Sequence, residues 1–394
     1  MSTIATPVKP RRVLIVTNTF WFTYNFLPAL VLALQQSGYE VVAVAADGKY
    51  RQPLLPYVDR VRILRHMVAH SINPLREIRV VRELHKLYRE EQPTIILHFT
   101  IKPDIYGTFA AARQGLPSVA TVTGLGYTFL NSNPITYISQ QLLRRALGRA
   151  DEVVFLNPDD REKYIEMSPS LAHNSVIVYG TGVDTRHYAP RAKSSTVGGS
   201  FVFLFVGRLL YDKGIREYVA AAKQLYSQGL KIECWILGAT ADNPASVSEA
   251  EVVQWASLDY IRYFGEVADV RPYISDADIV VLPSYREGLP RVILEGMSMY
   301  KPIIATDTAG CRETVEAGRN GWLVPVADTP ALTVAMRQAY LSDTEQLARM
   351  GDYSRKKVVT EFSDEIVTAR YLSIIDEVLG TTSNSTSVPH DANE

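Results

Sequence analysis

The chain has 394 residues, of which 47% are hydrophobic and 21% charged, a composition typical of a globular protein with two domains. Its two cysteines, Cys234 and Cys311, exclude a disulfide framework and indicate a reducing compartment. The N-terminal sequence lacks a signal-peptide pattern, and no window approaches the roughly 18 apolar residues that a membrane span requires. We therefore expect a cytoplasmic protein.

The formal net charge of −1 hides an asymmetry between the two halves of the chain. Residues 1–190 hold 21 Lys and Arg against 15 Asp and Glu, whereas residues 191–394 hold 20 against 27. A basic half joined to an acidic half indicates that the first half meets an anionic partner. The alternative is a chance excess, and charge alone does not decide between the two.

The first half alternates short apolar runs with amphipathic segments. Strands are predicted at 12–18, 40–46, 61–67, 94–100, 118–124, 152–157 and 176–180. Helical patterns lie at 25–37, 75–90, 104–114, 135–149 and 158–167. Short runs buried on both faces, alternating with helices, are typical of an open parallel sheet.

The same alternation restarts after the polar stretch PRAKSSTVGGS, which ends at Ser200. Strands are predicted there at 201–207, 232–238, 261–267, 278–284, 302–307 and 321–325, followed by a mostly helical end. The predicted organisation is a first domain, a linker, a second domain and a polar disordered tail, at 1–185, 186–200, 201–380 and 381–394. We predict an α/β protein of two doubly wound domains. Ligands bind beyond the carboxyl ends of such strands, so two facing edges would form one cleft.

The loop that opens the second domain carries two cations. In GRLLYDKG, Gly207 ends a strand, Arg208 follows it, and Lys213 stands just before a helix. Glycine lets a ligand approach the backbone closely, and a helix start offers free N–H groups to an anion. A guanidinium and an ammonium on one loop suit a diphosphate that gains charge as it leaves. Solvated loop cations are the alternative, which this stretch alone does not exclude.

The stretch SYREGLPRVILEGM, residues 284–297, holds two glutamates with seven residues between them. Glu287 follows a predicted strand, and Glu295 lies more than a turn inside a helix that begins near Pro290. Amides at the helix start would face an anion, helped by the helix dipole. Both carboxylates would accept hydrogen bonds from hydroxyl groups of one ligand, although on spacing alone two surface glutamates remain the alternative.

Together these two motifs resemble the retaining glycosyltransferases of family 4, which have the GT-B fold of two facing Rossmann-like domains. The stretches FGEVADVRPYISDADIVVLPSYREG and GCRETVEAGRNGWLVP are also similar to that family. The resemblance spans nearly the whole chain apart from its tail. It implies an enzyme that moves a sugar from a nucleotide-sugar donor to an acceptor.

The resemblance also implies a role for each matching residue. Arg208 and Lys213 would stabilise the departing diphosphate and Glu287 would lie near the anomeric centre, and these three are the predicted catalytic residues. Glu295 would bind the ribose hydroxyls. The other predicted donor-binding residues, which would contact the sugar, the phosphate or the nucleobase, are Gly207, Glu266, Val267, Gly288, Leu289 and Pro290.

The implied mechanism needs no metal, because cations and helix dipoles stabilise the departing diphosphate. No DxD motif stands at a predicted strand end, and NPDDREKY at 157–164 has the pattern of a helix start with N-terminal acids. We expect no cofactor, a UDP-linked donor, and retention of anomeric configuration by front-face attack.

The first domain departs from the family pattern at one point. Family members often carry a histidine after the strand that corresponds to SVATVTG, but this chain reads TVTGLGYTF there. Any catalytic residue in the first domain is therefore left open. His98 lies within a predicted strand and is predicted to be a core residue.

The stretches TGLGY and TIKPDIYG are similar to a subgroup that acts on lipid-linked oligosaccharides in bacterial glycan assembly. That resemblance implies an undecaprenyl-diphosphate-linked saccharide as acceptor. Its candidate contacts lie in the first strand-to-helix loop (Asn18, Tyr24, Asn25), after the strand 94–100 (Thr100, Lys102) and after the strand 118–124 (Thr123, Gly124, Tyr127). Lys102 would meet the acceptor's diphosphate, unless it is simply solvated.

Two predicted helices, at 75–90 and 137–152, are basic and amphipathic, a pattern typical of helices that lie on anionic lipid. Helices that cover a sheet are also amphipathic, so a surface facing water is the alternative. We expect peripheral association with the inner face of the plasma membrane and no nucleic-acid partner.

Three alternatives stay open. A transferase of the same fold with a soluble acceptor would remain active without a membrane or lipid carrier. A nonhydrolysing UDP-sugar epimerase would convert free nucleotide sugar without any acceptor. A non-catalytic scaffold of a polysaccharide complex is disfavoured by the intact set of Arg208, Lys213, Glu287 and Glu295.

Overall fold

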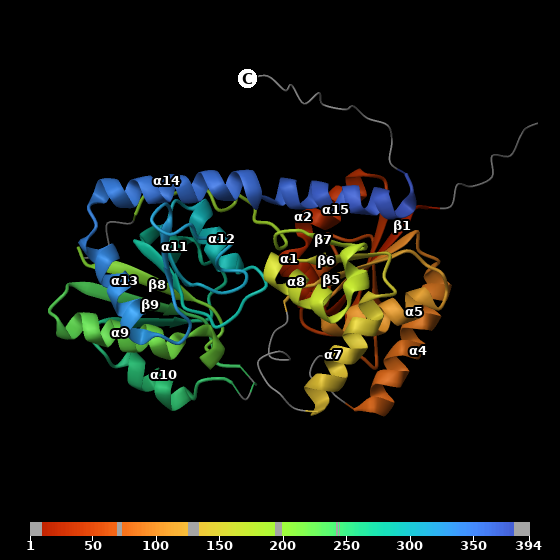
Figure 1. The fold of residues 1–394 in the computed structure, drawn as a ribbon, viewed down its shortest axis with the longest axis horizontal. Helices are drawn as coiled ribbons and strands as arrows, with labels where there is room; N and C mark the ends of the chain where they lie inside the picture. Colours follow the sequence, from red (N-terminus) through yellow and green to blue (C-terminus); the bar gives the residue numbers. More distant parts are fainter. Residues whose placement is uncertain are drawn as a thin grey trace, which may run out of the picture. The chain divides into compact units, whose positions relative to one another are not determined.

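Two parallel sheets organise the chain (Figure 1). The computed structural model describes residues 10–68, 73–124, 134–193, 199–241, 243 and 245–381. The first sheet has the order β3-β2-β1-β4-β5-β6-β7 and the second β10-β9-β8-β11-β12-β13. In both, the chain builds outward from an inner strand and then switches to that strand's other side, which is the doubly wound pattern. The predicted fold class is confirmed.

Every predicted strand has a counterpart in the structure. The first sheet contains β1 (Arg12–Thr19), β2 (Glu40–Ala46), β3 (Arg60–Ile63), β4 (Ile95–Phe99), β5 (Ser118–Val122), β6 (Glu152–Phe155) and β7 (Ser175–Ile177). The second contains β8 (Phe201–Val206), β9 (Ile232–Leu237), β10 (Ile261–Gly265), β11 (Ile279–Leu282), β12 (Ile303–Thr306) and β13 (Gly321–Val324). The strand predicted at 61–67 is too long, since β3 ends at Ile63. Leu64 and Met67 continue the apolar pattern because they are buried, although they lie beyond the strand.

Helices connect the strands. In the first half they are α1 (Phe20–Phe26), α2 (Pro28–Gln36), α3 (Arg51–Leu54), α4 (Pro74–Glu91), the π-helix η1 (Pro103–Gly107), α5 (Thr108–Ala112), α7 (Pro134–Leu147), α8 (Pro158–Met167) and the 3-10 turn η2 (Pro169–Ala172). In the second half they are the 3-10 turn η3 (Tyr211–Lys213), α9 (Ile215–Ser227), α10 (Glu249–Ala256), α11 (Arg271–Asp276), α12 (Arg291–Ser298), α13 (Thr329–Leu341), α14 (Thr344–Glu361) and α15 (Asp364–Leu379). No helix in these ranges is long and apolar enough to cross a membrane.

The predicted loop after β1 is wrong. Helix α1 begins directly after the strand, so Tyr24 and Asn25 are helical residues. The predicted helix at 25–37 is instead interrupted at Leu27, whose φ of −118° and ψ of 12° are not helical. Pro28 explains the break, because proline disfavours helical backbone at the preceding residue and is itself well suited to start a helix.

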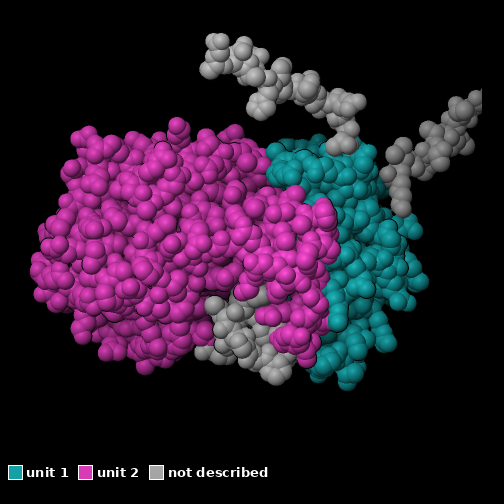
Figure 2. Space-filling model, in the orientation of Figure 1, with its two compact units in different colours: residues 1–121, 145–153, 368–394 teal, residues 122–144, 154–367 magenta. Residues whose placement is uncertain are grey.

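The chain divides into two compact units, which Figure 2 shows in different colours. Unit 1 comprises 1–121, 145–153 and 368–394, and unit 2 comprises 122–144 and 154–367. Unit 2 therefore takes in segments that the sequence analysis assigned to the first domain. The domain boundaries predicted from sequence stay a prediction, and the tail, apart from Thr381, lies outside the described residues.

Unit 2 is a three-layer structure around the second sheet. Helices α9 and α10 lie on one side of β8 and β9, and α12 and α14 lie on the other (Figure 1). The inner strands are buried on both faces, with Phe203, Leu204 and Val280 fully inaccessible to solvent. A rigid sheet of this kind holds the loops beyond its strand ends in fixed positions, and the candidate site lies there.

Candidate active site

A small pocket of unit 2 lies where the second sheet reverses its order. Its volume is about 230 Å³, and it is formed by the loops after β8 and β11, the segment after β5 and residues near 243. The carboxyl ends of strands at such a switch point are where ligands bind in doubly wound sheets. The lining residues are Thr123, Gly124, Arg208, Leu210, Asp212, Lys213, Asn243, Ala245, Arg286, Glu287 and Gly288.

The pocket brings together the three predicted catalytic residues. Lys213 Nζ lies 2.5 Å from Glu287 Oε1, and the two side chains are only 19% and 13% exposed. Arg208 is exposed, and its guanidinium has no hydrogen-bond or ion-pair partner among the described residues. The pocket thus presents one unpaired cation beside a second cation that is held by a carboxylate.

Gly214 determines where Lys213 lies. It follows η3 with a left-handed φ of 69°, which glycine adopts at little cost. A Cβ at this position would collide with the backbone carbonyl oxygen of Pro283, just beyond β11. The turn after β8 can therefore rest on the end of β11 only because this residue is glycine, and that contact places Lys213 beside Glu287.

The loop after β11 is fixed by backbone contacts. Glu287 N–H donates to Ala309 O at 3.3 Å, and Thr308 Oγ1 donates to Tyr285 O at 3.1 Å. The backbone N–H groups of Gly288 and Leu289 have no acceptor within the described ranges. Gly288 in particular lines the pocket, so it offers a free donor to an anion.

Pro290 corrects one part of the predicted donor site. Proline has no N–H, and Pro290 is buried at the N-cap of α12, so it donates no amide to a ligand. Leu289 likewise turns its side chain into the core. Of the predicted donor-binding residues 288–290, only Gly288 and Leu289 can therefore donate a backbone N–H group.

Glu295 lies inside α12 and does not line the pocket. It is almost buried, its carboxylate is 3.2 Å from Arg291 Nε, and burial raises its pKa against the opposing effects of Arg291 and Tyr188. Glu266 is exposed after β10, and Val267 packs against the core. The ribose and nucleobase contacts assigned to these residues stay predictions.

The acceptor candidates are divided between the units. Thr123 and Gly124 line the same pocket as Arg208 and Lys213, whereas Tyr127 lies outside the described residues. The other five candidates belong to unit 1, at the carboxyl ends of β1 and β4 and in the helices that follow, namely Asn18, Tyr24, Asn25, Thr100 and Lys102.

Asn18 and Thr100 meet at the switch point of the first sheet. The Asn18 backbone N–H donates to Thr100 Oγ1 at 3.2 Å, and Asn18 Oδ1 is buried with no partner among the described residues. Thr100 has a φ of 75°, a conformation that strains a β-branched residue. Such strain is found at functional sites more often than elsewhere, which favours this corner of unit 1 as a binding site.

The remaining candidates have partners within unit 1. Lys102 Nζ lies 2.6 Å from Glu77 Oε1 and both side chains are nearly buried, so its charge is neutralised and it is not a solvated lysine. The ring of Tyr24 contacts those of Tyr50 and Tyr57. Among these residues, Lys102 is therefore the least suited to bind a diphosphate.

His98 is a core residue, as predicted. It is fully buried in β4, with its ring nitrogens 2.9 Å from Tyr88 Oη and 3.3 Å from Thr108 Oγ1. Burial lowers the pKa of its imidazole to about 3. A histidine that stays neutral inside the sheet is not placed to exchange protons with a substrate.

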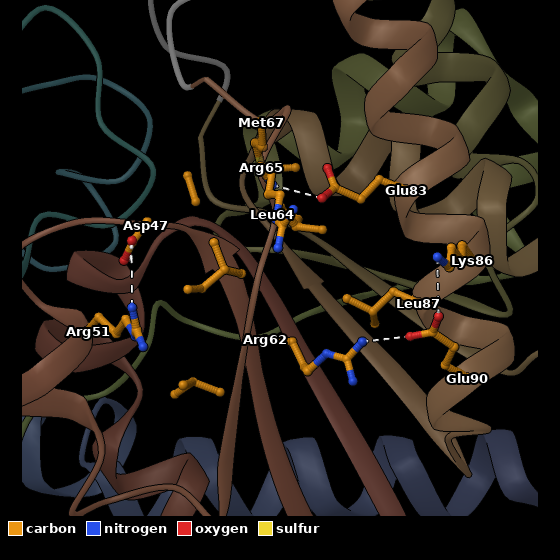
Figure 3. A pocket seen from close by; sticks show the side chains of 13 residues that line it. Asp47, Arg51, Arg62, Leu64, Arg65, Met67, Glu83, Lys86, Leu87 and Glu90 are labelled. Atoms are coloured by element: carbon orange, nitrogen blue, oxygen red, sulfur yellow. Dashed lines mark hydrogen bonds and ion pairs between the residues drawn. The ribbon is translucent and has the colours of Figure 1, made fainter.

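A larger hollow, of about 900 Å³, lies in unit 1 beside β3 and α4 (Figure 3). Its charged side chains face one another in pairs: Arg62 is 2.7 Å from Glu90, and Arg51 is 3.6 Å from Asp47. No residue predicted to bind a ligand lines it. We therefore place the candidate site in the smaller pocket of unit 2.

Sequence reasoning assigned no role to several pocket residues. Asp212, Asn243 and Ala245 have no distinguishing pattern, whereas Arg286 stands directly before Glu287 and could have been assigned a role on that ground. Within the described ranges no group of three or more His, Cys, Asp or Glu side chains is placed to hold a metal ion. The metal-free mechanism itself stays a prediction.

Comparison with known proteins identifies the chain's family. The model of Glycosyltransferase Family 4 matches residues 26–187, and the model of Glycosyl transferases group 1 matches residues 200–342. A Campylobacter jejuni relative, N,N'-diacetylbacillosaminyl-diphospho-undecaprenol alpha-1,3-N-acetylgalactosaminyltransferase, is 22% identical, over 90% of this chain and 96% of its own. The Staphylococcus aureus capsular polysaccharide biosynthesis glycosyltransferase CapM is 24% identical, over 85% and 89%.

A solved structure has the same fold. HepE from Anabaena, in complex with UDP and glucose, superposes with a TM-score of 0.77 at 18% identity, over 93% of this chain and all of that one. The two family matches together span most of the chain and leave a gap within the predicted linker. The chain is a glycosyltransferase of the GT-B fold, with one domain of Glycosyltransferase Family 4 and one of the Glycosyl transferases group 1.

Proposed function

We propose that the enzyme transfers a hexose or N-acetylhexosamine from a UDP-sugar to an undecaprenyl-diphosphate-linked saccharide, with retention of anomeric configuration, in surface polysaccharide or glycan biosynthesis. The observation that carries the proposal is the pocket in which Arg208, Lys213 and the free amide of Gly288 converge. The activity of the C. jejuni relative supports the acceptor class, and the UDP in the HepE complex supports the donor class.

The pocket's charges suit the leaving group of this reaction. As the glycosidic bond to the diphosphate breaks, negative charge grows on the phosphate oxygens, and preorganised donors stabilise it. Within the described part of the chain Arg208 has no competing partner, while Lys213 is held by Glu287 until an anion arrives. A phosphate that takes Lys213 would release the Glu287 carboxylate, which then accepts a hydrogen bond from the donor sugar.

A thermal-shift screen against UDP-, GDP-, ADP- and dTDP-sugars tests the donor class. A ligand at 100 times its dissociation constant adds about 2.7 kcal/mol to the free energy of unfolding. We expect stabilisation by UDP-sugars alone, lost in Arg208→Ala. Stabilisation by a different nucleotide would refute the UDP assignment, and no stabilisation by any of them would contradict a donor site in this pocket.

Replacing Glu295 by alanine should mainly raise the donor KM, because a ribose contact is made equally in the ground state and the transition state. Since the carboxylate is buried beside Arg291, the variant also needs a check of folding. Glu295→Gln keeps the shape of the side chain and one acceptor oxygen. Its donor KM should therefore lie between those of the unmodified chain and Glu295→Ala. A lowered kcat with an unaltered KM would contradict the ribose role.

Activity should survive complete removal of divalent metal. The reason is that Arg208, Lys213 and helix-start amides supply the charge that a metal ion otherwise provides. The assay compares turnover before and after dialysis against EDTA. Abolition by EDTA with rescue by Mg²⁺ or Mn²⁺ would refute the metal-free mechanism.

We further propose that unit 1 docks on the inner membrane surface through the start of α4. Leu75, Ile78 and Val68 are 70%, 49% and 41% exposed. Lys102 Nζ bonds both Val68 O and Glu77, which places Val68 beside the first turn of α4. Apolar side chains that are left in water together favour an apolar surface.

The charges around this patch suit an anionic membrane. Three arginines follow on the same helix at intervals of three residues, all exposed and without an ion-pair partner in the described part of the chain: Arg76, Arg79 and Arg82. Each basic residue near an anionic leaflet contributes about 1 kcal/mol to binding, and salt screens the attraction.

The double variant Leu75→Ser, Ile78→Ser should bind vesicles containing phosphatidylglycerol at least about tenfold more weakly, from the lost apolar transfer energy. Sedimentation with the vesicles measures the loss. The control is Val334→Ser, Leu341→Ser on α13, where the side chains are 56% and 59% exposed. If both variants and the unmodified chain bind the vesicles equally, the start of α4 does not contact the membrane and the proposal is refuted.

A further inference from the structure

The turn before α8 is bonded to the loop after β11, which carries Arg286 and Gly288. Asn157 is fully buried at the N-cap of α8, where its Oδ1 accepts from the Asp160 N–H at 2.8 Å. Its Nδ2 donates to the carbonyl oxygen of Gly288 at 2.7 Å, 131 residues further along the chain. One asparagine therefore caps a helix and holds the carbonyl group of a glycine that lines the pocket.

Asp160 holds the neighbouring side chain of the same loop. Its carboxylate is fully buried and forms an ion pair with Arg286, while Asn157 Nδ2 lies 3.2 Å from its other oxygen. Burial raises the pKa of Asp160, and the Arg286 guanidinium opposes that rise. The carboxylate thus has a partner for each oxygen and fixes the guanidinium from one side.

Arg286 keeps a spare donor. Its side chain lines the pocket and is 20% exposed, and its Nε is buried with no acceptor among the described residues. A buried donor without a partner costs free energy unless a ligand supplies an acceptor. Arginine presents its donors as a rigid fork that matches phosphate oxygens, so one edge can hold Asp160 while another serves a ligand.

We infer that Arg286 is a third diphosphate-binding cation of the donor pocket, and that Asp160 and Asn157 are the positioning residues that aim it and the Gly288 peptide. This inference rests on the proposed function, because it assigns the anion to the donor's diphosphate. The contribution of Asp160 is then exerted through Arg286, and that of Asn157 through the peptide it holds.

A double-mutant cycle on Asp160 and Arg286 tests the inference. Removing Arg286 alone leaves a buried carboxylate unpaired, so Arg286→Gln is made both alone and with Asp160→Asn, with the melting temperature of each variant recorded. The readouts are the dissociation constants of UDP and of inorganic diphosphate, with donor KM and kcat. Residues that act as one unit give non-additive effects.

We expect Arg286→Gln to weaken diphosphate binding by about tenfold or more, the loss of a charge-assisted hydrogen bond. Asp160→Asn should weaken it less, and the double variant no more than Arg286→Gln alone. Arg286→Lys should restore part of the affinity. If Asp160→Asn costs as much without the arginine as with it, or if Arg286→Gln leaves the affinity unchanged, the inference is overturned.

A matched control is Arg312, which, like Arg286, forms an ion pair with an aspartate at the start of α8. Arg312 pairs with Asp159 at 3.0 Å and with Asp307 at 2.9 Å, but it does not line the pocket. Arg312→Gln should leave both dissociation constants unchanged, and a loss equal to that of Arg286→Gln would overturn the inference.

The inorganic diphosphate probe separates the inference from the proposed function. Binding of diphosphate that depends on Arg286, without binding of any UDP-sugar, would uphold the inference and refute the donor assignment. If UDP-sugar binds equally well with and without Arg286, the donor assignment is upheld and the inference is refuted. Binding of neither by the unmodified chain would refute both.

Discussion

Arg208→Ala and Lys213→Ala should each lower kcat/KM by about two orders of magnitude, or ~3 kcal/mol of transition-state stabilisation, as for a lost oxyanion-hole donor. The two variants differ in what they leave behind. Arg208 has no partner among the described side chains, so its removal takes away only contacts with the ligand. Removal of Lys213 also leaves the largely buried Glu287 without its ion pair. Steady-state kinetics with the donor that the thermal-shift screen selects measures both effects.

Lys223→Ala is the control for these variants, because Lys223 is an exposed cation on α9 of the same unit and lies outside the pocket. It should leave turnover unchanged. Arg208→Ala should also leave the free energy of unfolding unchanged, which separates a lost contact from a damaged fold. Full activity of Arg208→Ala and Lys213→Ala would refute the proposal that these two residues bind the donor's diphosphate.

Gly214→Ala should destabilise unit 2 by ~3 kcal/mol or more and abolish most activity. A left-handed backbone costs a residue with a Cβ about 1–2 kcal/mol, and overpacking against the Pro283 carbonyl adds a comparable amount. To relieve the collision the turn must move away from β11, which carries Lys213 away from Glu287. Denaturant unfolding and a transfer assay measure the two consequences.

Gly229→Ala isolates the steric part of that effect. Gly229 has a φ of 79°, close to the 69° of Gly214, but a Cβ there would meet nothing within 4 Å. It should cost about 1–2 kcal/mol of stability and leave kcat of the folded enzyme intact. Equal losses in the two variants would mean that the contact with Pro283 does not position the pocket.

The inner strands could be predicted because they are buried on both faces. A run such as Val13–Val16 or Phe203–Phe205 is continuously apolar, and few other arrangements satisfy such a run. The shared position of Arg208 and Lys213 could be predicted because one loop carries both residues directly after a strand. Such features involve residues that are close together in the sequence, so they can be recognised without knowledge of the fold.

The parts that could not be predicted depend on contacts between distant segments. Asn157 and Asp160 have the pattern of a helix start, and nothing local indicates that they also bond Gly288 and Arg286. Lys102 resembled a loop cation, but its partner Glu77 lies 25 residues earlier, on α4. The placement of Thr123 beside the donor residues likewise requires the folded chain.

The most direct test of the account is transfer of labelled sugar to lipid. The enzyme is incubated with a radiolabelled UDP-sugar and an undecaprenyl-diphosphate-linked saccharide, and the label in the organic phase is compared for the unmodified chain and Arg208→Ala. The account predicts label in the lipid fraction that requires both the lipid carrier and Arg208. Label that passes instead to a soluble saccharide, or a donor that stays untransferred despite binding, would contradict it.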